Sequence, residues 1–337
     1  MTLHDFIRAM PKVELHVHLQ GATRPETLLK LAQRNHIQLP ADDVEGMREW
    51  YTFRDFGHFI EIYDVICRCL QTPDDIELVM REFIAGQVAQ NIRYTEVTYT
   101  PTLRMPSSEQ FQALDEARKW GQDSHGITVN IVIDIPRGLI SPEDNMQFAD
   151  IAIEGMNYGV VAFGLGGPEA GNPPENFIAP FDHARAAGLP SVPHAGEVVG
   201  PESIWGALNR LHAVRIGHGV RCLEDPALVE ELRARQIPLE VCPTSNICLG
   251  VFPTIESHPL PRLIEEGLYV TLNSDDPPMF NTTLTDEFLI AAEVFGFDEA
   301  MIRRLTLNAV RASFLPDDEK RRLETEYIRA FDQLQAG

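Results

Sequence analysis

Eight short runs rich in β-branched residues recur along the chain, and longer segments with the apolar spacing of helices separate them. The predicted strands cover residues 13–19, 92–100, 128–135, 160–167, 189–194, 213–219, 238–242 and 268–275. Helices are predicted between them, for instance over 107–125, 142–157, 174–187, 202–211, 226–235 and 255–266. Eight strands that alternate with helices in 337 residues predict a (β/α)8 TIM barrel, with a doubly wound open sheet as the alternative.

Two segments are longer than a minimal barrel needs. Residues 20–91 separate the first two strands and leave room for two or three helices, and residues 277–337 continue with a helical pattern. Long insertions after barrel strands often cover the active site, so we expect extra helices after strand one to form a lid and additional helices to follow strand eight. No linker, low-complexity tract or internal repeat divides the sequence, which predicts a single domain over residues 1–337.

The chain is strongly acidic, with 28 Lys and Arg residues against 50 Asp and Glu residues and a formal net charge of −22. Phosphate backbones and anionic lipid surfaces repel such a chain, which excludes a basic nucleic-acid binder and favours small-molecule partners. The five cysteines are sparse and lack zinc-ribbon spacing, and the sequence shows no N-terminal signal or membrane-spanning run. We therefore expect a cytoplasmic protein with reduced thiols and no membrane partner; its oligomeric state is left open.

Histidines and carboxylates gather at the ends of predicted strands. His16 and His18 lie two apart in strand one, so their side chains project to the same face. Alone, such a pair is more often two ordinary buried or surface histidines than a metal site. Further candidates follow strands five, six and eight: His194 with Glu197, His218, and Asp275 with Asp276. Active sites of (β/α)8 enzymes lie at the C-terminal ends of the strands, so we expect these residues to converge there.

This set of side chains favours a metal ion. Three neutral imidazoles and one carboxylate suit a divalent transition metal, above all Zn²⁺, with a position left for water. The remaining groups then resemble acid–base machinery. A carbamylated lysine that bridges two metals is not expected, because none of the four lysines lies in a predicted strand: Lys12, Lys30, Lys119 and Lys320. We therefore predict one metal ion per chain.

Five motifs occur in the order found in the adenosine deaminase group of the amidohydrolase superfamily, and the chain resembles that family from about Met10 to Leu315. The motifs are MPKVELHVHLQGA (10–22), SVPHAGE (191–197), RIGHGVR (215–221), LEVCPTSN (239–246) and LNSDDPP (272–278). The resemblance implies a zinc hydrolase that replaces the 6-amino group of a purine with oxygen. Adenosine is the leading substrate, with inosine and ammonia as products. The Pro-Cys-x-x-Cys signature of nucleic-acid-editing zinc deaminases does not occur in the sequence.

The resemblance also implies roles for single residues. The residues that match its zinc ligands are His16, His18, His194 and Asp275. Glu197 resembles the residue that protonates purine N1 as hydroxide adds to C6, and His218 the group that orients or deprotonates the zinc-bound water. The predicted catalytic residues are therefore Glu197, His218 and Asp275. Asp276 resembles the contact to purine N7 and Gly167 the backbone donor to N3, so the predicted substrate-binding residues are His18, Gln20, Gly167 and Asp276.

Several of these assignments have a structural alternative. Glu197 could be a carboxylate at a helix start, because Pro201 and Glu202 indicate a helix nearby, and the two aspartates at 275 and 276 could form a turn before two prolines. Residues 53–66 carry an apolar stripe that resembles the family's flap over the substrate, although such a stripe is more often core. Its members are Phe53, Phe56, Phe59, Ile60 and Tyr63.

Two positions depart from the adenosine-specific members of the family. Gln20 stands where they have an Asp that contacts the ribose 5′-hydroxyl, and Gly-Pro-Glu at 167–169 replaces Gly-Asp-Glu. Both features resemble a bacterial branch that includes deaminases of 6-amino-6-deoxyfutalosine, an adenosine-like compound with a carboxyphenyl group at the 5′ side. Loss of a carboxylate suits an anionic 5′ substituent. This compound and free adenine are alternative substrates; a zinc barrel that hydrolyses another cyclic amidine and a non-catalytic nucleoside binder are alternative functions.

Overall fold

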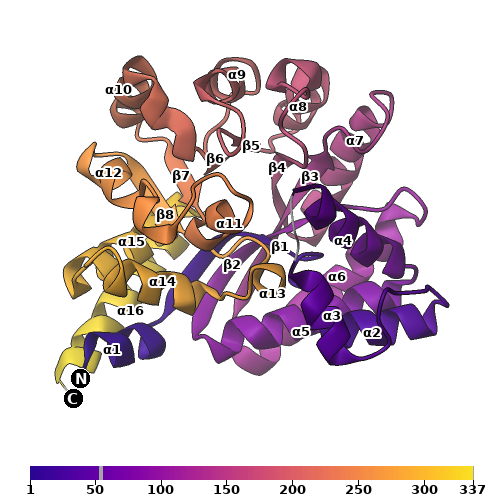
Figure 1. The fold of residues 1–337 in the computed structure, drawn as a ribbon, viewed down its shortest axis with the longest axis horizontal. Helices are drawn as coiled ribbons and strands as arrows, with labels where there is room; N and C mark the ends of the chain where they lie inside the picture. Colours follow the sequence, from indigo (N-terminus) through magenta and orange to yellow (C-terminus); the bar gives the residue numbers. More distant parts are fainter. Residues whose placement is uncertain (53–55, 337) are drawn as a thin grey trace.

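The computed structural model describes residues 1–52 and 56–336, and its strands form one eight-stranded parallel sheet (Figure 1). The strands are β1 (Lys12–His18), β2 (Ile92–Tyr99), β3 (Thr128–Pro136), β4 (Val160–Gly166), β5 (Ser191–Ala195), β6 (Ile216–His218), β7 (Pro238–Val241) and β8 (Tyr269–Leu272). Each strand pairs with the next in chain order. A doubly wound sheet would reorder its strands, so the predicted (β/α)8 barrel is confirmed and the alternative is wrong.

The first and last strands meet through a short seam. The N–H of Asp275 donates to the carbonyl of His16 (3.1 Å), and the carbonyl of Asp275 accepts the N–H of His18 (2.9 Å). Earlier in the same segment, the Asn273 side-chain oxygen accepts the N–H groups of Leu15 (2.9 Å) and His16 (3.1 Å). The Asn273 side chain and the Asp275 backbone, both after β8, therefore close the barrel in place of a regular hydrogen-bond ladder between β8 and β1.

Four helices of the described chain lie between β1 and β2, where the sequence predicted two or three. They are α2 (Pro25–Arg34), α3 (Val44–Tyr51), α4 (Phe56–Cys69) and α5 (Pro73–Ala89). The Asp43 carboxylate accepts the Gly46 N–H at the start of α3, and Thr72 and Asp75 form a capping box at the start of α5. These capped starts divide a segment whose length alone indicated fewer helices. Phe53 of the predicted flap lies outside the described residues.

The other helices surround the sheet, as Figure 1 shows. They are α1 (Leu3–Ala9), α6 (Ser107–His125), α7 (Asn145–Gly155), α8 (Ile178–Ala186), α9 (Pro201–Arg210), α10 (Pro226–Arg235), α11 (Pro243–Cys248), α12 (Leu260–Glu265), α13 (Pro277–Phe280), α14 (Leu284–Glu293), α15 (Glu299–Ala312) and α16 (Asp317–Ala336). Short 3₁₀ segments are η1 (Met156–Tyr158), η2 (Pro174–Phe177), η3 (Val220–Glu224) and η4 (Ile255–Ser257). The predicted helices after strand eight are thus present as α13–α16. Among the described helices, none has both the length and the apolar character to cross a bilayer.

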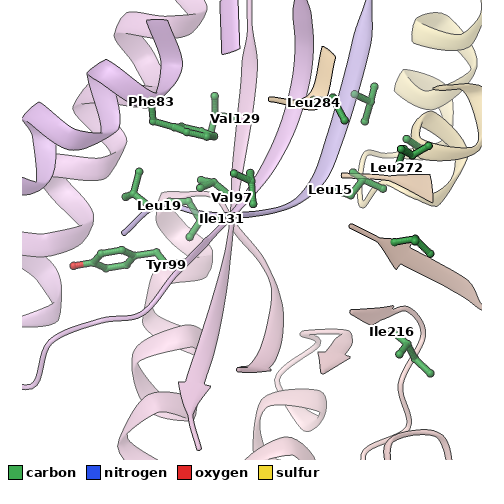
Figure 2. Close-up of a cluster of buried hydrophobic side chains, with 14 of the residues drawn as sticks. Leu15, Leu19, Phe83, Val97, Tyr99, Val129, Ile131, Ile216, Leu272 and Leu284 are labelled. Carbon is green, nitrogen blue, oxygen red and sulfur yellow. The ribbon is translucent and has the colours of Figure 1, made fainter. Parts of the chain in front are cut away.

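The main hydrophobic core lies between the sheet and the surrounding helices. Figure 2 shows part of it, with Phe83 of α5 beside Val129 of β3, and with Leu15 and Leu272 from the first and last strands on the other side of the view. Because side chains alternate along a strand, the outward position of Leu15 turns His16 and His18 to the other face, toward the barrel interior. The alternation of VELHVHL therefore places its apolar residues in the core and its histidines in the site.

The barrel interior holds charged groups beside a small apolar cluster of Val132, Ala162 and Val192. The Arg215 guanidinium lies 2.6 Å from Glu96 Oε2 and 2.6 Å from Glu240 Oε1, and all three side chains are buried. Buried charges are stable in a protein only when they are paired, and here one guanidinium pairs with two carboxylates. It forms a rigid ionic support for the residues above it at the strand ends.

Candidate active site

The candidate residues meet at the C-terminal ends of four strands. His16 and His18 belong to β1, His194 to β5 and His218 to β6, while Asp275 follows β8. Each of these side chains is at least nine-tenths buried. The expected convergence of these residues at the strand ends therefore occurs.

Four nitrogen and oxygen atoms form a compact cluster with the dimensions of a metal site. His18 Nε2 lies 3.2 Å from His194 Nε2 and 3.3 Å from Asp275 Oδ1, and His16 Nε2 lies 3.4 Å from the same oxygen. A tetrahedral zinc ion with bonds of about 2.0–2.2 Å separates its ligand atoms by about 3.3–3.6 Å. The spacing of these residues thus fits the ion that the sequence predicted.

Neighbouring groups orient two of these four side chains. Glu240 Oε2 lies 2.9 Å from His16 Nδ1, so it can accept the proton on that nitrogen and leave Nε2 free. His16 Nε2 makes no hydrogen bond among the described residues, although it faces Asp275. The Ser245 hydroxyl donates to Asp275 Oδ2 (2.6 Å). A carboxylate behind a histidine is the usual support of a metal ligand, so the residues fit zinc in their outer contacts as well.

A second metal ion is not favoured by the described residues. His218, Cys242 and Asp275 also lie close together, but burial raises the pKa of the Cys242 thiol well above its usual range and keeps it protonated. Lys12 is the first residue of β1, contrary to the prediction that every lysine lies outside the strands, because the strand begins one residue earlier than its apolar pattern. Its ammonium group donates to the carbonyls of Met10 (3.1 Å) and Gln90 (3.0 Å) at the opposite end of the strand.

The protonation states of Glu197 and His218 suit acid–base chemistry. Burial, with Asp275 and Glu169 nearby, raises the pKa of Glu197 to about 8, so the carboxyl group is protonated at neutral pH. Burial lowers the pKa of His218 to about 3, so this imidazole is neutral. His218 Nε2 lies 3.6 Å from Glu197 Oε1 and 3.8 Å from Asp275 Oδ2. A proton donor and a neutral imidazole therefore stand together beside the metal cluster.

Glu169 holds the loop that carries Glu197. One of its oxygens accepts the N–H of Gly196 (2.7 Å), and the other accepts those of Val198 and Val199 (2.7 Å each). Glu197 is therefore not a carboxylate at a helix start, which was the structural alternative, because α9 begins only at Pro201. The loop is fixed by charge-assisted bonds on both sides of the acid.

An inner cavity lies directly over the cluster. It is lined by Glu197, Gly167, Asp276 and Asp134 and is closed by α4 through Phe56, Phe59, Ile60 and Tyr63. The described members of the apolar stripe thus line the site, as the flap reading predicted. Burial and the charge of Asp275 raise the pKa of Asp276 well above its usual range, so it can donate a proton to an acceptor in the cavity.

An outer cavity of about 600 Å³ adjoins the inner one, since both are lined by Ile60, Tyr63, Thr100, Pro136 and Leu139. Gln20 lines this outer cavity and not the inner one. Its amide nitrogen donates to the Thr100 carbonyl (2.7 Å), and the Thr100 hydroxyl donates to Asp134 Oδ1 (2.6 Å). Gln20 in the outer cavity is therefore linked through Thr100, which lines both cavities, to Asp134 in the inner one.

Sequence reasoning missed the residues that support the site. Glu240 and Asn246 lie in LEVCPTSN and Glu169 in Gly-Pro-Glu, but the motifs imply no role for any of the three. The available signal was a charged residue inside an apolar strand, as in PLEVC for Glu240 and TVNIVIDI for Asp134. Charges at such positions need a buried partner, which can be expected from the sequence but not identified in it.

Comparison with known proteins finds matches over nearly the whole chain. Residues 11–330 match the family model described as adenosine deaminase. An aminodeoxyfutalosine deaminase from Streptomyces avermitilis is 43% identical over 333 residues, which are 96% of this chain and 92% of that protein. The resemblance predicted over residues 10–315 is thereby confirmed.

Two solved structures share the fold. An adenine deaminase from Arthrobacter aurescens has a TM-score of 0.87 and 32% identity, over 95% of this chain and 99% of that one. An amidohydrolase from Burkholderia ambifaria with bound Zn has a TM-score of 0.91 and 26% identity, over 100% of this chain and 95% of that one. Both matches agree with the barrel, and the bound Zn of the second agrees with the cluster of metal-binding side chains at the strand ends of this chain.

Proposed function

Because this chain belongs to the adenosine deaminase family and is a hydrolase of carbon–nitrogen bonds in cyclic amidines, we propose that its substrate is a 6-aminopurine nucleoside extended at the 5′ end, as in aminodeoxyfutalosine. The family and the relatives support deamination of an aminopurine. Water adds at C6, the bond from C6 to the amine breaks, and ammonia leaves. Adenosine, the leading substrate implied by the sequence motifs, stays a prediction.

The outer cavity is the observation that carries the choice of substrate. A free base needs only a cavity over the metal cluster, and adenosine adds a ribose. Here the adjoining space of about 600 Å³ is large enough for a further group, with apolar or aromatic walls from Tyr99, Pro101, Leu139, Ile140 and Phe148. Such walls suit a phenyl ring better than a hydroxyl group.

Two arginines, Arg68 and Arg104, line this cavity together with two carboxylates, Glu61 and Asp64. The Arg68 guanidinium lies 3.6 Å from Asp64 and is partly neutralised by it. Arg104 is exposed and has no ion pair among the described residues. A guanidinium matches the geometry of a carboxylate, so Arg104 suits the acid of a carboxyphenyl group.

The inner residues have proposed roles in the reaction. We propose that His16, His18, His194 and Asp275 hold one zinc ion per chain, which when bound supplies a water of lowered pKa, about 7, as the nucleophile. Protonated Glu197 donates to purine N1 as the oxygen adds to C6, which reduces the negative charge on the ring. Asp276 donates to N7, and Gly167 offers its backbone N–H to N3.

All five cysteines are unpaired, which supports the predicted cytoplasmic location.

Ammonia release from three substrates tests this proposal. The zinc-loaded enzyme is assayed with aminodeoxyfutalosine, adenosine and adenine, and kcat/KM is expected to be highest for aminodeoxyfutalosine. Arg104→Gln should lower that value by about 10-fold or more, because it removes a charged hydrogen bond, and leave adenine unchanged. Arg93→Gln, at an exposed arginine at the start of β2, is the matched control and should change none of the three.

The other outcomes separate the alternatives. If no substrate releases ammonia, the deaminase function is wrong. Equal losses with all three substrates in Arg104→Gln would show that Arg104 does not contact the 5′ group. The highest value with adenine would favour a second candidate, adenine deaminase. That candidate is supported by the Arthrobacter structure and by the inner cavity, which α4 closes over the metal cluster.

A further inference from the structure

Behind His218, away from the cavity, lie two buried polar side chains that the proposed reaction does not use. Asn246 is in α11, and His258 lies between η4 and α12; both are at least 97% buried. The amide nitrogen of Asn246 lies 3.2 Å from His218 Nδ1, and the amide oxygen lies 3.1 Å from His258 Nε2. His258 Nδ1 in turn accepts the backbone N–H of Leu260 (3.2 Å).

The backbone end of this chain sets the direction of every bond in it. The Leu260 N–H can only donate, so His258 Nδ1 must accept and its proton must reside on Nε2. His258 Nε2 then donates to the Asn246 oxygen, which turns the Asn246 NH₂ group toward His218. His218 Nδ1 must therefore accept, and in the neutral imidazole the proton resides on Nε2, the nitrogen that faces Glu197 and Asp275.

The opposite orientation of the amide is excluded by the same contacts. It would place the NH₂ group of Asn246 against the N–H of His258, with two donors in contact and no acceptor. Buried groups left without a partner cost about 1–3 kcal/mol each. Protonation of His258 would not remove this clash, because it would place a second N–H, on Nδ1, against the Leu260 N–H. A charged imidazole is also disfavoured there, because the rings of Phe252 and Phe295 lie beside it, with ring centroids 5.3 and 6.3 Å away.

We propose that Asn246 and His258 are positioning residues that hold His218 as the tautomer with its proton on Nε2. His218 then donates a hydrogen bond toward the space between Glu197 and Asp275, and it cannot take up a proton there. This favours one of the two roles predicted for His218, which is to orient the attacking water through the proton on Nε2. The catalytic consequence rests on the proposed function, whereas the tautomer does not.

Nitrogen-15 NMR of histidine-labelled protein tests the tautomer directly. Long-range proton–nitrogen spectra of the zinc-loaded enzyme should show His218 protonated on Nε2 and not on Nδ1. Asn246→Asp replaces the donor with an acceptor, so Nδ1 of His218 should become protonated. Asn130→Asp, a partly buried position in β3 outside the site, is the matched control and should leave the His218 signals unchanged.

Kinetics of two His258 variants add a second readout. His258→Gln keeps an N–H donor for Asn246 and should retain near-normal kcat, whereas His258→Leu removes it. His258→Leu and Asn246→Asp should lower kcat by about 10–100-fold with KM unchanged, which is the usual effect of losing a supporting contact. Zinc content and Tm confirm that each variant is folded and loaded.

The proposal is overturned if wild-type His218 carries its proton on Nδ1, or if its signals are unchanged in both Asn246→Asp and His258→Leu. Should Asn246→Asp fail to fold, the two His258 variants decide: equal kcat values in the Gln and Leu variants contradict the proposal. The observed Nε2 tautomer in an enzyme that deaminates none of the purines would uphold the positioning pair and reject the proposed function instead.

Discussion

Gly21 leaves the space that the carboxyl group of Asp276 occupies. A Cβ atom at position 21 would lie 1.5 Å from Asp276 Oδ1 and 2.4 Å from its Cγ. The glycine after Gln20 is thus required by a side chain from the far end of the barrel sequence. Asp276 Oδ1 has no hydrogen-bond partner among the described residues, and Asp276 is one of the residues that line the inner cavity.

We expect Gly21→Ala to lower the free energy of unfolding by about 1–3 kcal/mol, as is typical of overpacking, and to displace Asp276, which lowers kcat/KM for the purine substrate. Zinc content should be unchanged, since the four ligands stay in place. Gly86→Ala in α5 is the control, because its Cβ would approach only the end of the flexible Arg24 side chain (3.0 Å). Unchanged kinetics in Gly21→Ala would show that the position of Asp276 does not matter for turnover.

The rate should depend on the protonated form of Glu197. Its pKa is raised to about 8, so kcat/KM is expected to be constant near neutral pH and to fall as the pH rises through about 8. Glu197→Gln should bind zinc normally but lose about 10²–10⁴-fold in kcat. A pH series with metal analysis checks both statements. Near-normal turnover in this variant is incompatible with Glu197 as the proton donor.

Glu240 should affect the metal more than the substrate. Glu240→Gln keeps the volume but weakens the acceptor for His16 Nδ1 (2.9 Å), so zinc affinity is expected to fall about 10–100-fold. Competition with a chelating dye measures this change. Glu231→Gln, on the exposed face of α10, is the matched control. An unaltered zinc affinity in Glu240→Gln would mean that the carboxylate supports only Arg215.

Glu287 should make stability depend on pH. Its oxygens accept the Thr282 hydroxyl (2.6 Å) and the Thr244 N–H (3.2 Å), and burial raises its pKa from 4.5 to about 7. The folded state therefore binds this proton more tightly than the unfolded state, and the free energy of unfolding should fall as the pH rises from about 4.5 to 7. Glu287→Gln should show a smaller decrease in Tm between pH 5 and pH 8. Parallel Tm curves for the two proteins would contradict this assignment.

The order of the strands could be predicted from the sequence, but the ends of β6 and β8 could not. The expected strand 213–219 is only Ile216–His218, and 268–275 is only Tyr269–Leu272. His218 and Asp275 have φ values of 61° and 65°, in the left-handed region that side chains rarely adopt. Residue types that indicate a strand continue into these positions, while the site bends the backbone there.

The metal cluster could be predicted because its residues end strands that a barrel brings together. The groups behind it could not, since their partners are distant in the chain: Glu240 and His16 are 224 residues apart, and Asn246 and His218 are 28 apart. A buried acid or amide shows in the sequence only as a polar residue in an apolar segment. Its partner is decided by packing, which periodicity does not specify.

The seam at Asp275 has a consequence for the order of events on the ribosome. Asn273 and Leu15 are 258 residues apart, so the two sides of the seam are made at nearly opposite ends of synthesis. A nascent chain that has emerged through β7 already contains three histidines of the cluster but neither the carboxylate nor the contacts that join β1 to β8. The last strand and the residues after it therefore complete the barrel and the metal cluster together, and a shorter nascent chain leaves one edge of β1 unpaired.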